Sequence, residues 1–351
     1  MPTVDSTPDR VPEASRLLGL VSGSWKTQAV HVAARLRIAD HLSGGARTVA
    51  ELAAATGAQP DSLHRFLRAL TTIDLILERE DGSFELTPMG ALLGDGAPDS
   101  LRSWVLHWGG TSWPVWGHLL HSVMTGESAR SLVYGTHGFE HLERDAEAAA
   151  TFHQAMVELT RLVAHDFVRA VDWSRAKRIV DVGGGYGELL AAALLASPGS
   201  VGILYDTEQA IERGRAHLRA AGLEHRCEFV AGDFFDWVPR GADTYLLKSV
   251  IHDWDDERAA EILASCRRAI APEGRLLVIE RVVPERIGSS PGDQGLACSD
   301  LHMLVQLGAR ERTDAELRGL LSQAGFRTVR VAPLRSTLSL LESIPVDDEA
   351  A

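Results

Sequence analysis

The pattern of hydrophobic and polar positions changes near the middle of the chain. Over residues 12–93, apolar residues recur at the spacing of short amphipathic helices. In the segment 48–57, Thr48 and Glu51 form the sequence pattern of a capping box, and Gly57 is typical of a helix end. These features predict a helical N-terminal domain.

A second helix and a hairpin are expected in the same domain. The helix should begin at Asp61, and Asp81-Gly82 is a turn signal between two short strands within residues 76–86. Helix, turn, helix and hairpin together predict a winged helix. The apolar residues expected on one face of the second helix are Leu63, Phe66, Leu67 and Leu70.

Winged helices can bind DNA, but the charges of this one oppose it. The formal net charge of the chain is −13. In the expected hairpin, Arg79 is the single base among four acidic residues, so phosphate would repel it. We therefore expect no nucleic-acid partner, but a domain that packs against itself or against a partner chain. The four acidic residues are Glu78, Glu80, Asp81 and Glu85.

Residues 101–171 are expected to be helical and are rich in tryptophan, phenylalanine and histidine. Two interpretations are open: a helical core with histidines at its edges, or the wall of a pocket for a flat ligand. The chain as a whole then divides into four expected segments. These are a frayed tail at 1–11, the winged helix at 12–100, the helical segment at 101–172 and a third domain at 173–351.

From Arg178 onward, short apolar segments alternate with helical ones, which predicts an α/β fold with a mostly parallel sheet. A helix expected over 257–270 carries an apolar stripe, as a crossover helix does. The last two strands have no helix between them and should pair antiparallel. The expected strands are 178–182, 201–205, 227–231, 244–248, 275–281, 327–332 and 337–342.

Composition adds several exclusions. No apolar segment reaches the length of a bilayer span, and the polar, acidic first residues do not resemble a signal peptide. The three cysteines are far apart and match no metal-ligand spacing. We therefore expect a cytoplasmic protein with no membrane partner and no metal.

A glycine-rich turn carries the first chemical signal. The expected strand 178–182 leads into Gly183 and Gly185, and a helix follows. Glycines let a ligand approach the backbone closely. Asp181 stands just before the turn, where its carboxylate would oppose a pyrophosphate but suits a cofactor with a cationic ammonium and sulfonium.

The next two strands also end in residues that suit a ligand. Asp206 follows the second strand, where a carboxylate can accept both ribose hydroxyls. Asp233 and Phe234 follow the third, where they could bind and cover an adenine. Because the carboxyl ends of parallel strands share one crevice, the three strands together predict an adenosine-cofactor site.

His252 follows the fourth strand directly. A neutral imidazole there would be a suitable base near neutral pH. Position alone supports equally a solvated loop histidine that neighbouring aspartates keep charged.

In these stretches the chain resembles the plant-type small-molecule O-methyltransferases, the family of caffeic acid and hydroxyindole O-methyltransferases. The family has bacterial members in natural-product pathways, such as antibiotic biosynthesis. The resemblance implies a Rossmann-like S-adenosylmethionine methyltransferase fold with an N-terminal winged-helix dimerisation domain, and a homodimer. The matching stretches are 152–156, 180–187, 232–235, 247–254, 278–280 and 311–313, and the likeness covers nearly the whole chain.

The resemblance also implies roles for individual residues. His252 would remove the proton of a substrate hydroxyl during in-line methyl transfer, which leaves S-adenosylhomocysteine; Glu280 and Glu311 would support it, and Asp253 belongs to the same set. Lys248 would join Gly183, Asp206, Asp233 and Phe234 at the cofactor. The acceptor, a small aromatic metabolite with a phenolic hydroxyl, would meet Phe152, Met156, Trp254, Met303 and Gln306.

Departures from the family leave alternatives open. Ala309-Arg310 stands where plant members commonly have Gly-Lys, and Gln306 where they often have Asn. The resemblance therefore does not single out a phenylpropanoid acceptor, and a bacterial polyketide-like phenol fits as well. The cofactor site could also serve hydroxylation or decarboxylation, or the acceptor atom could be a nitrogen. A winged-helix regulator is a third possibility, which the acidic hairpin opposes.

Overall fold

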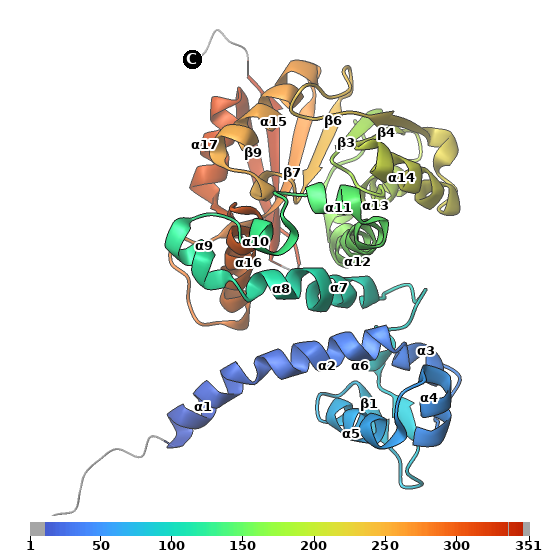
Figure 1. Cartoon of the computed structure of the whole chain (residues 1–351). Coiled ribbons are helices and arrows are strands. Elements are labelled where there is room, and N and C mark those ends of the chain that lie inside the picture. Colours follow the sequence, from blue (N-terminus) through green and yellow to red (C-terminus); the bar gives the residue numbers. More distant parts are fainter. Residues whose placement is uncertain (1–10, 336, 347–351) are drawn as a thin grey trace, which may run out of the picture. The chain divides into compact units, whose positions relative to one another are not determined.

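A computed structural model describes residues 11–335 and 337–346 of the chain (Figure 1). The expected frayed tail therefore lies, except for Val11, outside the described residues. The chain forms two compact units, of which the first ends at Gly110 and the second begins at Thr111. The expected helical segment 101–172 is thus divided between them. The four-part division stays a prediction.

The N-terminal unit contains the expected helices and hairpin. Thr48 accepts the N–H of Glu51 while Glu51 accepts that of Thr48, and Gly57 ends this helix with a φ of 71°. The two short strands pair antiparallel. The elements are α1 (Val11–Val21), α2 (Gly23–Arg35), α3 (Ile38–Leu42), α4 (Val49–Thr56), α5 (Pro60–Thr71), β1 (Ile76–Glu78), β2 (Phe84–Leu86), α6 (Pro88–Ala91) and α7 (Arg102–His107).

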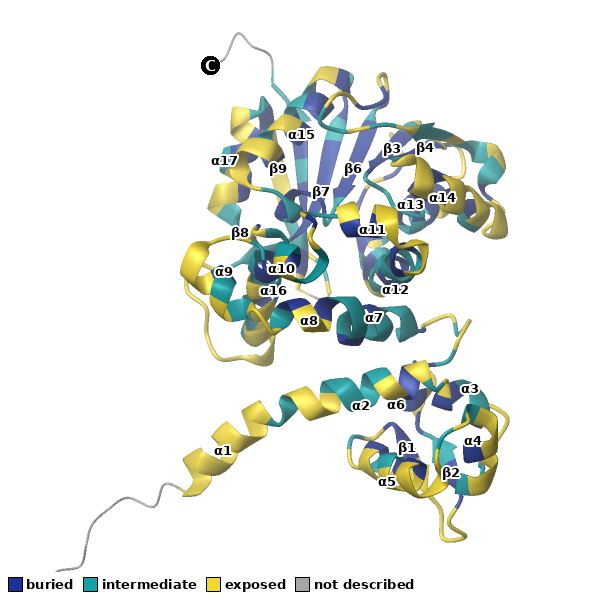
Figure 2. Ribbon diagram, in the orientation of Figure 1, coloured by how far each residue is buried: buried dark blue, intermediate teal, exposed yellow. Residues whose placement is uncertain are grey.

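One core and one exposed apolar helix characterise this unit. Leu63, Leu67 and Leu70 of α5 are buried as expected, whereas Phe66 is only partly buried. Helix α1 has no buried residue, and it appears yellow along its length in Figure 2. Its apolar side chains need another surface to cover them. The exposed apolar residues of α1 are Val11, Leu17, Leu18, Leu20 and Val21.

The second unit opens with helices. A π-helical turn, η1 (Trp108–Ser112), contains the boundary between the units. The longest helix begins at Ala146, and the carboxylate of the preceding Asp145 caps it by accepting the N–H groups of Glu147 and Ala148. The helices are α8 (Trp113–Trp116), α9 (Leu119–Thr125), α10 (Arg130–Tyr134), α11 (Glu140–Arg144) and α12 (Ala146–Ala170).

All seven strands expected in the C-terminal part are present in one eight-stranded sheet. Its order is β5-β4-β3-β6-β7-β10-β9, with β8 beside β7. Strands β3 to β7 run parallel, and β10 pairs antiparallel with β9, as expected. Strand β10 also pairs antiparallel with β7. The strands are β3 (Arg178–Val182), β4 (Val201–Asp206), β5 (Cys227–Ala231), β6 (Thr244–Lys248), β7 (Arg275–Val283), β8 (Arg312–Thr313), β9 (Phe326–Pro333) and β10 (Leu338–Pro345).

Helices cover both faces of this sheet, so most residues of its central strands β3, β6 and β7 are buried (Figure 2). Alternate residues enter two separate cores, for example Ile179 one and Val180 the other. Polar groups for chemistry can then project only from the strand ends. The covering elements are α13 (Glu188–Ala196), α14 (Glu208–Ala220), η2 (Glu224–Arg226), η3 (Ile251–Asp253), α15 (Asp256–Ala269), α16 (Pro291–Leu307) and α17 (Asp314–Gln323), and the expected stripe Ile262, Leu263, Cys266, Ala269 and Ile270 is buried.

Candidate active site

The glycine turn after β3 leaves its backbone open to a ligand. Gly183 and Gly185 have φ values of 65° and 58°, which favour glycine. The N–H of Gly185 donates to Oδ2 of Asp206 over 2.7 Å. The ends of β3 and β4 are thereby tied together, and Asp206 fixes the shape of the turn.

Asp181 is buried at the end of β3, and its Oδ2 has no hydrogen-bond partner among the described residues. Burial, helped by the charge of Asp206, raises the pKa of Asp181 to about 7. Nearby, burial and the charge of Arg281 lower the pKa of Lys248 to about 8. A buried carboxylate with a free oxygen is suited to a cationic ligand group such as an ammonium.

The end of β5 adds an aromatic wall. A Cβ on Gly183 would lie 3.5 Å from the ring of Phe234, so this ring faces the glycine turn. Asp233 accepts the N–H of Phe235 over 2.9 Å, which shapes the loop that presents Phe234. The structure therefore brings the expected cofactor residues of three successive strands to one edge of the sheet.

His153 lies against the same turn and was not expected there. Its ring stacks on Tyr186 with 5.0 Å between the ring centroids. A Cβ on Gly185 would lie 3.8 Å from its Nδ1. Burial lowers the pKa of His153, while the charge of Asp206 opposes that change. The sequence placed it in the aromatic helical segment and in the family-like stretch 152–156, without a role.

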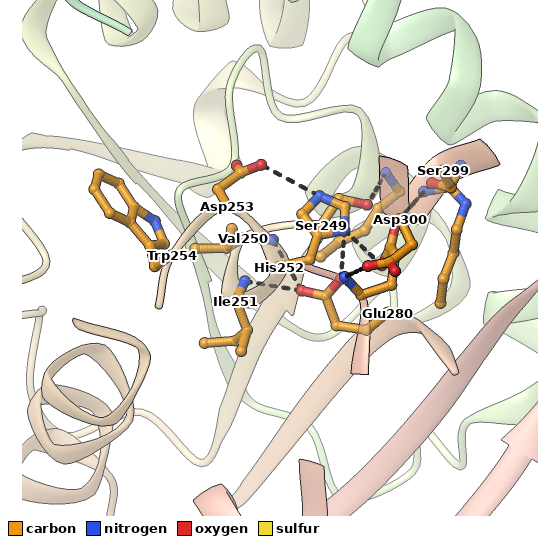
Figure 3. A network of polar contacts seen from close by, with 12 residues as sticks. Ser249, Val250, Ile251, His252, Asp253, Trp254, Glu280, Ser299 and Asp300 are labelled. Atoms are coloured by element: carbon orange, nitrogen blue, oxygen red, sulfur yellow. Dashed lines mark hydrogen bonds and ion pairs between the residues drawn. The ribbon is translucent and has the colours of Figure 1, made fainter. Parts of the chain in front are cut away.

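His252 lies in η3 and is buried, and Figure 3 shows Glu280 and Asp253 on opposite sides of its ring. Its Nδ1 lies 3.1 Å from Oε2 of Glu280 and 3.1 Å from Oε2 of Glu311. Only the contact with Glu311 has hydrogen-bond geometry, so Glu280 acts on the ring mainly through its charge. Nε2 faces Oδ1 of Asp253 at 3.4 Å.

Each glutamate is itself held in place. Oε1 of Glu280 accepts the N–H groups of Val250 and Ile251 over 3.0 and 2.8 Å, which fixes the turn before His252. Oε1 of Glu311 accepts the hydroxyl of Ser299 over 2.7 Å. The ring of His252 is therefore positioned by groups that are already immobilised.

The charges around His252 decide its protonation. Burial alone would lower its pKa, but the charges of Glu280, Glu311 and Asp253 outweigh burial and raise the pKa of His252 to about 9. Burial raises the pKa of Asp253 to about 7, against the influence of His252. Burial acts to raise the pKa of Glu311, but the charge of His252 and its hydrogen bond lower it. The site therefore stabilises a protonated imidazole.

His252, Glu280 and Glu311 also offer three ligand atoms within 4.8 Å of one another, a donor set that a metal ion could use. Glu311 already has two cationic neighbours, because Arg281 lies 3.6 Å from its Oε1. The absence of a metal stays a prediction.

The expected acceptor residues lie on separate elements. Phe152 and Met156 are partly buried on α12, and Trp254 packs edge-on against Phe235 at 4.7 Å between ring centroids. Met303 is buried on α16. The amide of Gln306 is engaged inside the protein: its Oε1 accepts from Arg130, and its Nε2 donates to the carbonyl of Ser112. Contact of these five residues with an acceptor stays a prediction.

No described helix combines the length and the apolar character that crossing a membrane requires.

Comparison with known proteins gives one consistent family. Residues 116–327 match the O-methyltransferase domain, and residues 18–95 match the O-methyltransferase dimerisation domain. The phenazine O-methyltransferase PhzM of Lysobacter antibioticus is 43% identical over 336 residues, which cover 96% of this chain and 97% of that protein. The 8-amino-8-demethylriboflavin N,N-dimethyltransferase of Streptomyces davaonensis is 37% identical, with 89% and 90% covered.

A solved structure extends the likeness to three dimensions. It is an O-methyltransferase from neocarzinostatin biosynthesis in complex with S-adenosylmethionine and 2-hydroxy-5-methyl naphthoic acid. The TM-score is 0.78 at 36% identity, and 92% of this chain and 96% of that chain are covered. Fold and both domain matches agree, and the chain belongs to the O-methyltransferase family, with a dimerisation domain ahead of its catalytic domain.

Proposed function

We propose that the protein transfers the methyl group of S-adenosylmethionine to a hydroxyl of a small aromatic metabolite, with His252 as the general base. The observation that carries the proposal is the buried imidazole whose Nδ1 lies against two glutamates while Nε2 remains on the other side of the ring. It follows the carboxyl end of β6, and Val250, two residues before it, faces Gly183 of the glycine turn.

The residues at this edge suit S-adenosylmethionine, which supplies an activated methyl group on a sulfonium. The free oxygen of buried Asp181 matches a cationic ammonium, and Asp206, half-buried beside the turn, matches ribose hydroxyls. Phe234, facing Gly183, offers a surface for the adenine. Lys248 and Asp233 complete the set that we assign to the cofactor.

The hydrogen bond from Nδ1 to Glu311 sets the tautomer of His252. With the ring neutral, Nδ1 carries the hydrogen and Nε2 keeps the lone pair that accepts the hydroxyl proton. A phenol, whose pKa is about 10, becomes a strong nucleophile only when this proton leaves. Glu280 and Glu311 then stabilise the imidazolium that forms, as a buried carboxylate does in a catalytic triad.

The raised pKa of His252 predicts a pH dependence. With a pKa of about 9, on the order of one molecule in a hundred has a neutral ring at pH 7, so kcat/KM for the acceptor should rise about tenfold per pH unit toward pH 9. The measurement is kcat/KM between pH 6 and 10 with a phenolic acceptor. A profile that is flat or falls between pH 7 and 9 would contradict the assigned base.

A second candidate is methylation of an amine by the same site. It is favoured by the 37% identity to the N,N-dimethyltransferase named above. His252 would take the proton of the amine instead of that of a hydroxyl. Hydroxylation or decarboxylation at the cofactor site is a more distant alternative.

We assign the group around His252 to proton transfer and not to metal binding, because Arg281 and the imidazole already balance the charge of Glu311. The exposed apolar face of α1 supports a homodimer formed through the dimerisation domain.

Transfer of label from methyl-labelled S-adenosylmethionine to a panel of phenols and aromatic amines tests the proposal. NMR of the product identifies the methylated atom, and a parallel reaction with EDTA tests the need for a metal. We expect an O-methylated product whose yield EDTA does not change. Cofactor binding without methylation of any acceptor in a broad panel would overturn the proposal, and an N-methylated product would favour the second candidate.

A further inference from the structure

Arg130, the first residue of α10, is a buried cation without a carboxylate partner. Arg130 is only 5% exposed. No carboxylate of the described residues lies within ion-pair distance of its guanidinium. Its neighbours are neutral: Nη1 donates to the carbonyl of Gly138 over 2.6 Å and lies 3.4 Å from Nδ1 of His141, and Nη2 donates to Gln306 over 2.7 Å. Nε has no hydrogen-bond partner in the part of the chain that the structure describes.

Arg312 shows how a purely structural arginine is satisfied in this chain. It is the other buried arginine among the described residues. Its Nε donates to Asp256 over 2.9 Å, and Nη1 and Nη2 donate to the carbonyls of Ile251 and Trp254. Every nitrogen has a partner and the charge has a counter-ion. Arg130 has neither, and an unbalanced buried charge is costly unless another group completes it.

Arg130 donates a hydrogen bond to Gln306, a residue that the family resemblance assigns to the acceptor site. After burial, which lowers its pKa to about 10, the charge of Asp253 is the largest influence on Arg130. Asp253 is also the residue that faces Nε2 of His252. Helix α10 packs against α16, which carries Gln306 and Met303 (Figure 1). Gln306 receives one N–H of Arg130 and donates to Ser112, so it holds the guanidinium in place.

From this placement we infer that Arg130 is a specificity residue that binds a carboxylate on the methyl acceptor. The inference rests on the proposed function and narrows its acceptor class to aromatic hydroxy acids. Arginine has five N–H donors, and the recorded contacts engage Nη1 and Nη2 but leave the buried Nε without an acceptor, which a carboxylate oxygen would supply. The planar guanidinium suits a carboxylate better than a neutral group, and the bound anion supplies the missing counter-ion.

The test compares matched acceptors that differ only in this charge. Wild-type enzyme and Arg130→Gln are assayed with a series of hydroxynaphthoic acids and the corresponding hydroxynaphthamides. For wild type we expect the best acid to exceed its amide in kcat/KM by roughly 10- to 100-fold, the range of a hydrogen bond to a charged group. In Arg130→Gln this acid-to-amide ratio should fall toward one.

Two further variants separate recognition from structure. Gln306→Glu places an internal carboxylate beside Arg130 and should lower the acid-to-amide ratio while the arginine is retained. Arg226→Gln is the matched control. Arg226, in η2, donates to the carbonyls of Leu194, Ser197 and Ser200, so its replacement should lower stability but leave the acid-to-amide ratio unchanged. If Arg130→Gln does not fold, the acid-to-amide ratios of wild type and of Gln306→Glu still test whether Arg130 binds the carboxylate.

Calorimetric binding of the acids and amides to the enzyme with S-adenosylhomocysteine gives a readout that needs no turnover. Tighter binding of an acid than of its amide, lost in Gln306→Glu, supports the inference. Equal methylation and equal binding of acid and amide by wild type would overturn it and leave the proposed function intact. Failure to methylate any acceptor would count against the proposed function. The ratio of acid to amide binding affinity would still test the role of Arg130.

Discussion

We expect the His252→Ala variant to lose methyl transfer by about a hundredfold or more in kcat, the usual contribution of a general base. The buried ring is the one group placed between two glutamates and Asp253, and its Nε2 is not used by the hydrogen bond to Glu311. Without it, the phenolic proton must leave to water. The measurement is single-turnover transfer of labelled methyl at saturating S-adenosylmethionine.

Two controls make this result interpretable. Calorimetric binding of S-adenosylhomocysteine reports whether the cofactor site of His252→Ala is intact. Added imidazole should restore part of the rate, because a free base can then occupy the space left by the ring. If His252→Ala keeps most of the wild-type rate, the proposed methyltransferase activity would stand, but His252 would not be its general base.

The second large effect is expected from Glu280→Ala, and it should appear in stability as well as in rate. Glu280 is 1% exposed, accepts the N–H groups of Val250 and Ile251, and lies 3.1 Å from His252. Its removal leaves the two buried N–H groups without an acceptor and takes away one of the carboxylates that balance the charge of His252. This loss costs about 3–5 kcal/mol in the free energy of unfolding. Denaturant unfolding of the variant measures this loss.

Glu280→Gln is the matched variant. Its amide oxygen can still accept both N–H groups, so it should retain much of the stability lost in Glu280→Ala. Because the negative charge next to Nδ1 is gone, the pKa of His252 should fall, and the rise of kcat/KM should move to lower pH than in wild type. An unchanged profile would mean that Glu280 serves only the backbone of the turn.

Periodicity and glycine spacing predicted the architecture well because both report local physics. The strand after Arg178 and the capping box at Thr48 were placed correctly, since burial on both faces and capping leave clear residue patterns. Strand β8 was not predicted. With two residues beside β7, it has no periodicity to detect.

The state of the site could not be predicted in the same way. Sequence position left His252 balanced between a base and a solvated loop residue, and only the three-dimensional approach of Glu280 and Glu311 shows it buried against carboxylates. Contact of Gln306 with the acceptor stays a prediction, and its hydrogen bond to Arg130, which is 176 residues away in sequence, was not predicted. Contacts over such separations leave no local pattern, which also explains why Ser299, His153 and Arg130 were not expected.

The most direct test of the central claim varies the acidity of the acceptor. Wild type and His252→Ala are compared on a series of naphthols whose nitro substituents lower the pKa of the hydroxyl, up to one that is already ionised at the assay pH. If His252 removes the proton, the rate ratio of wild type to variant should fall from about a hundredfold for naphthol to less than about tenfold for the ionised acceptor. A ratio that stays constant across the series would contradict a general-base role for His252.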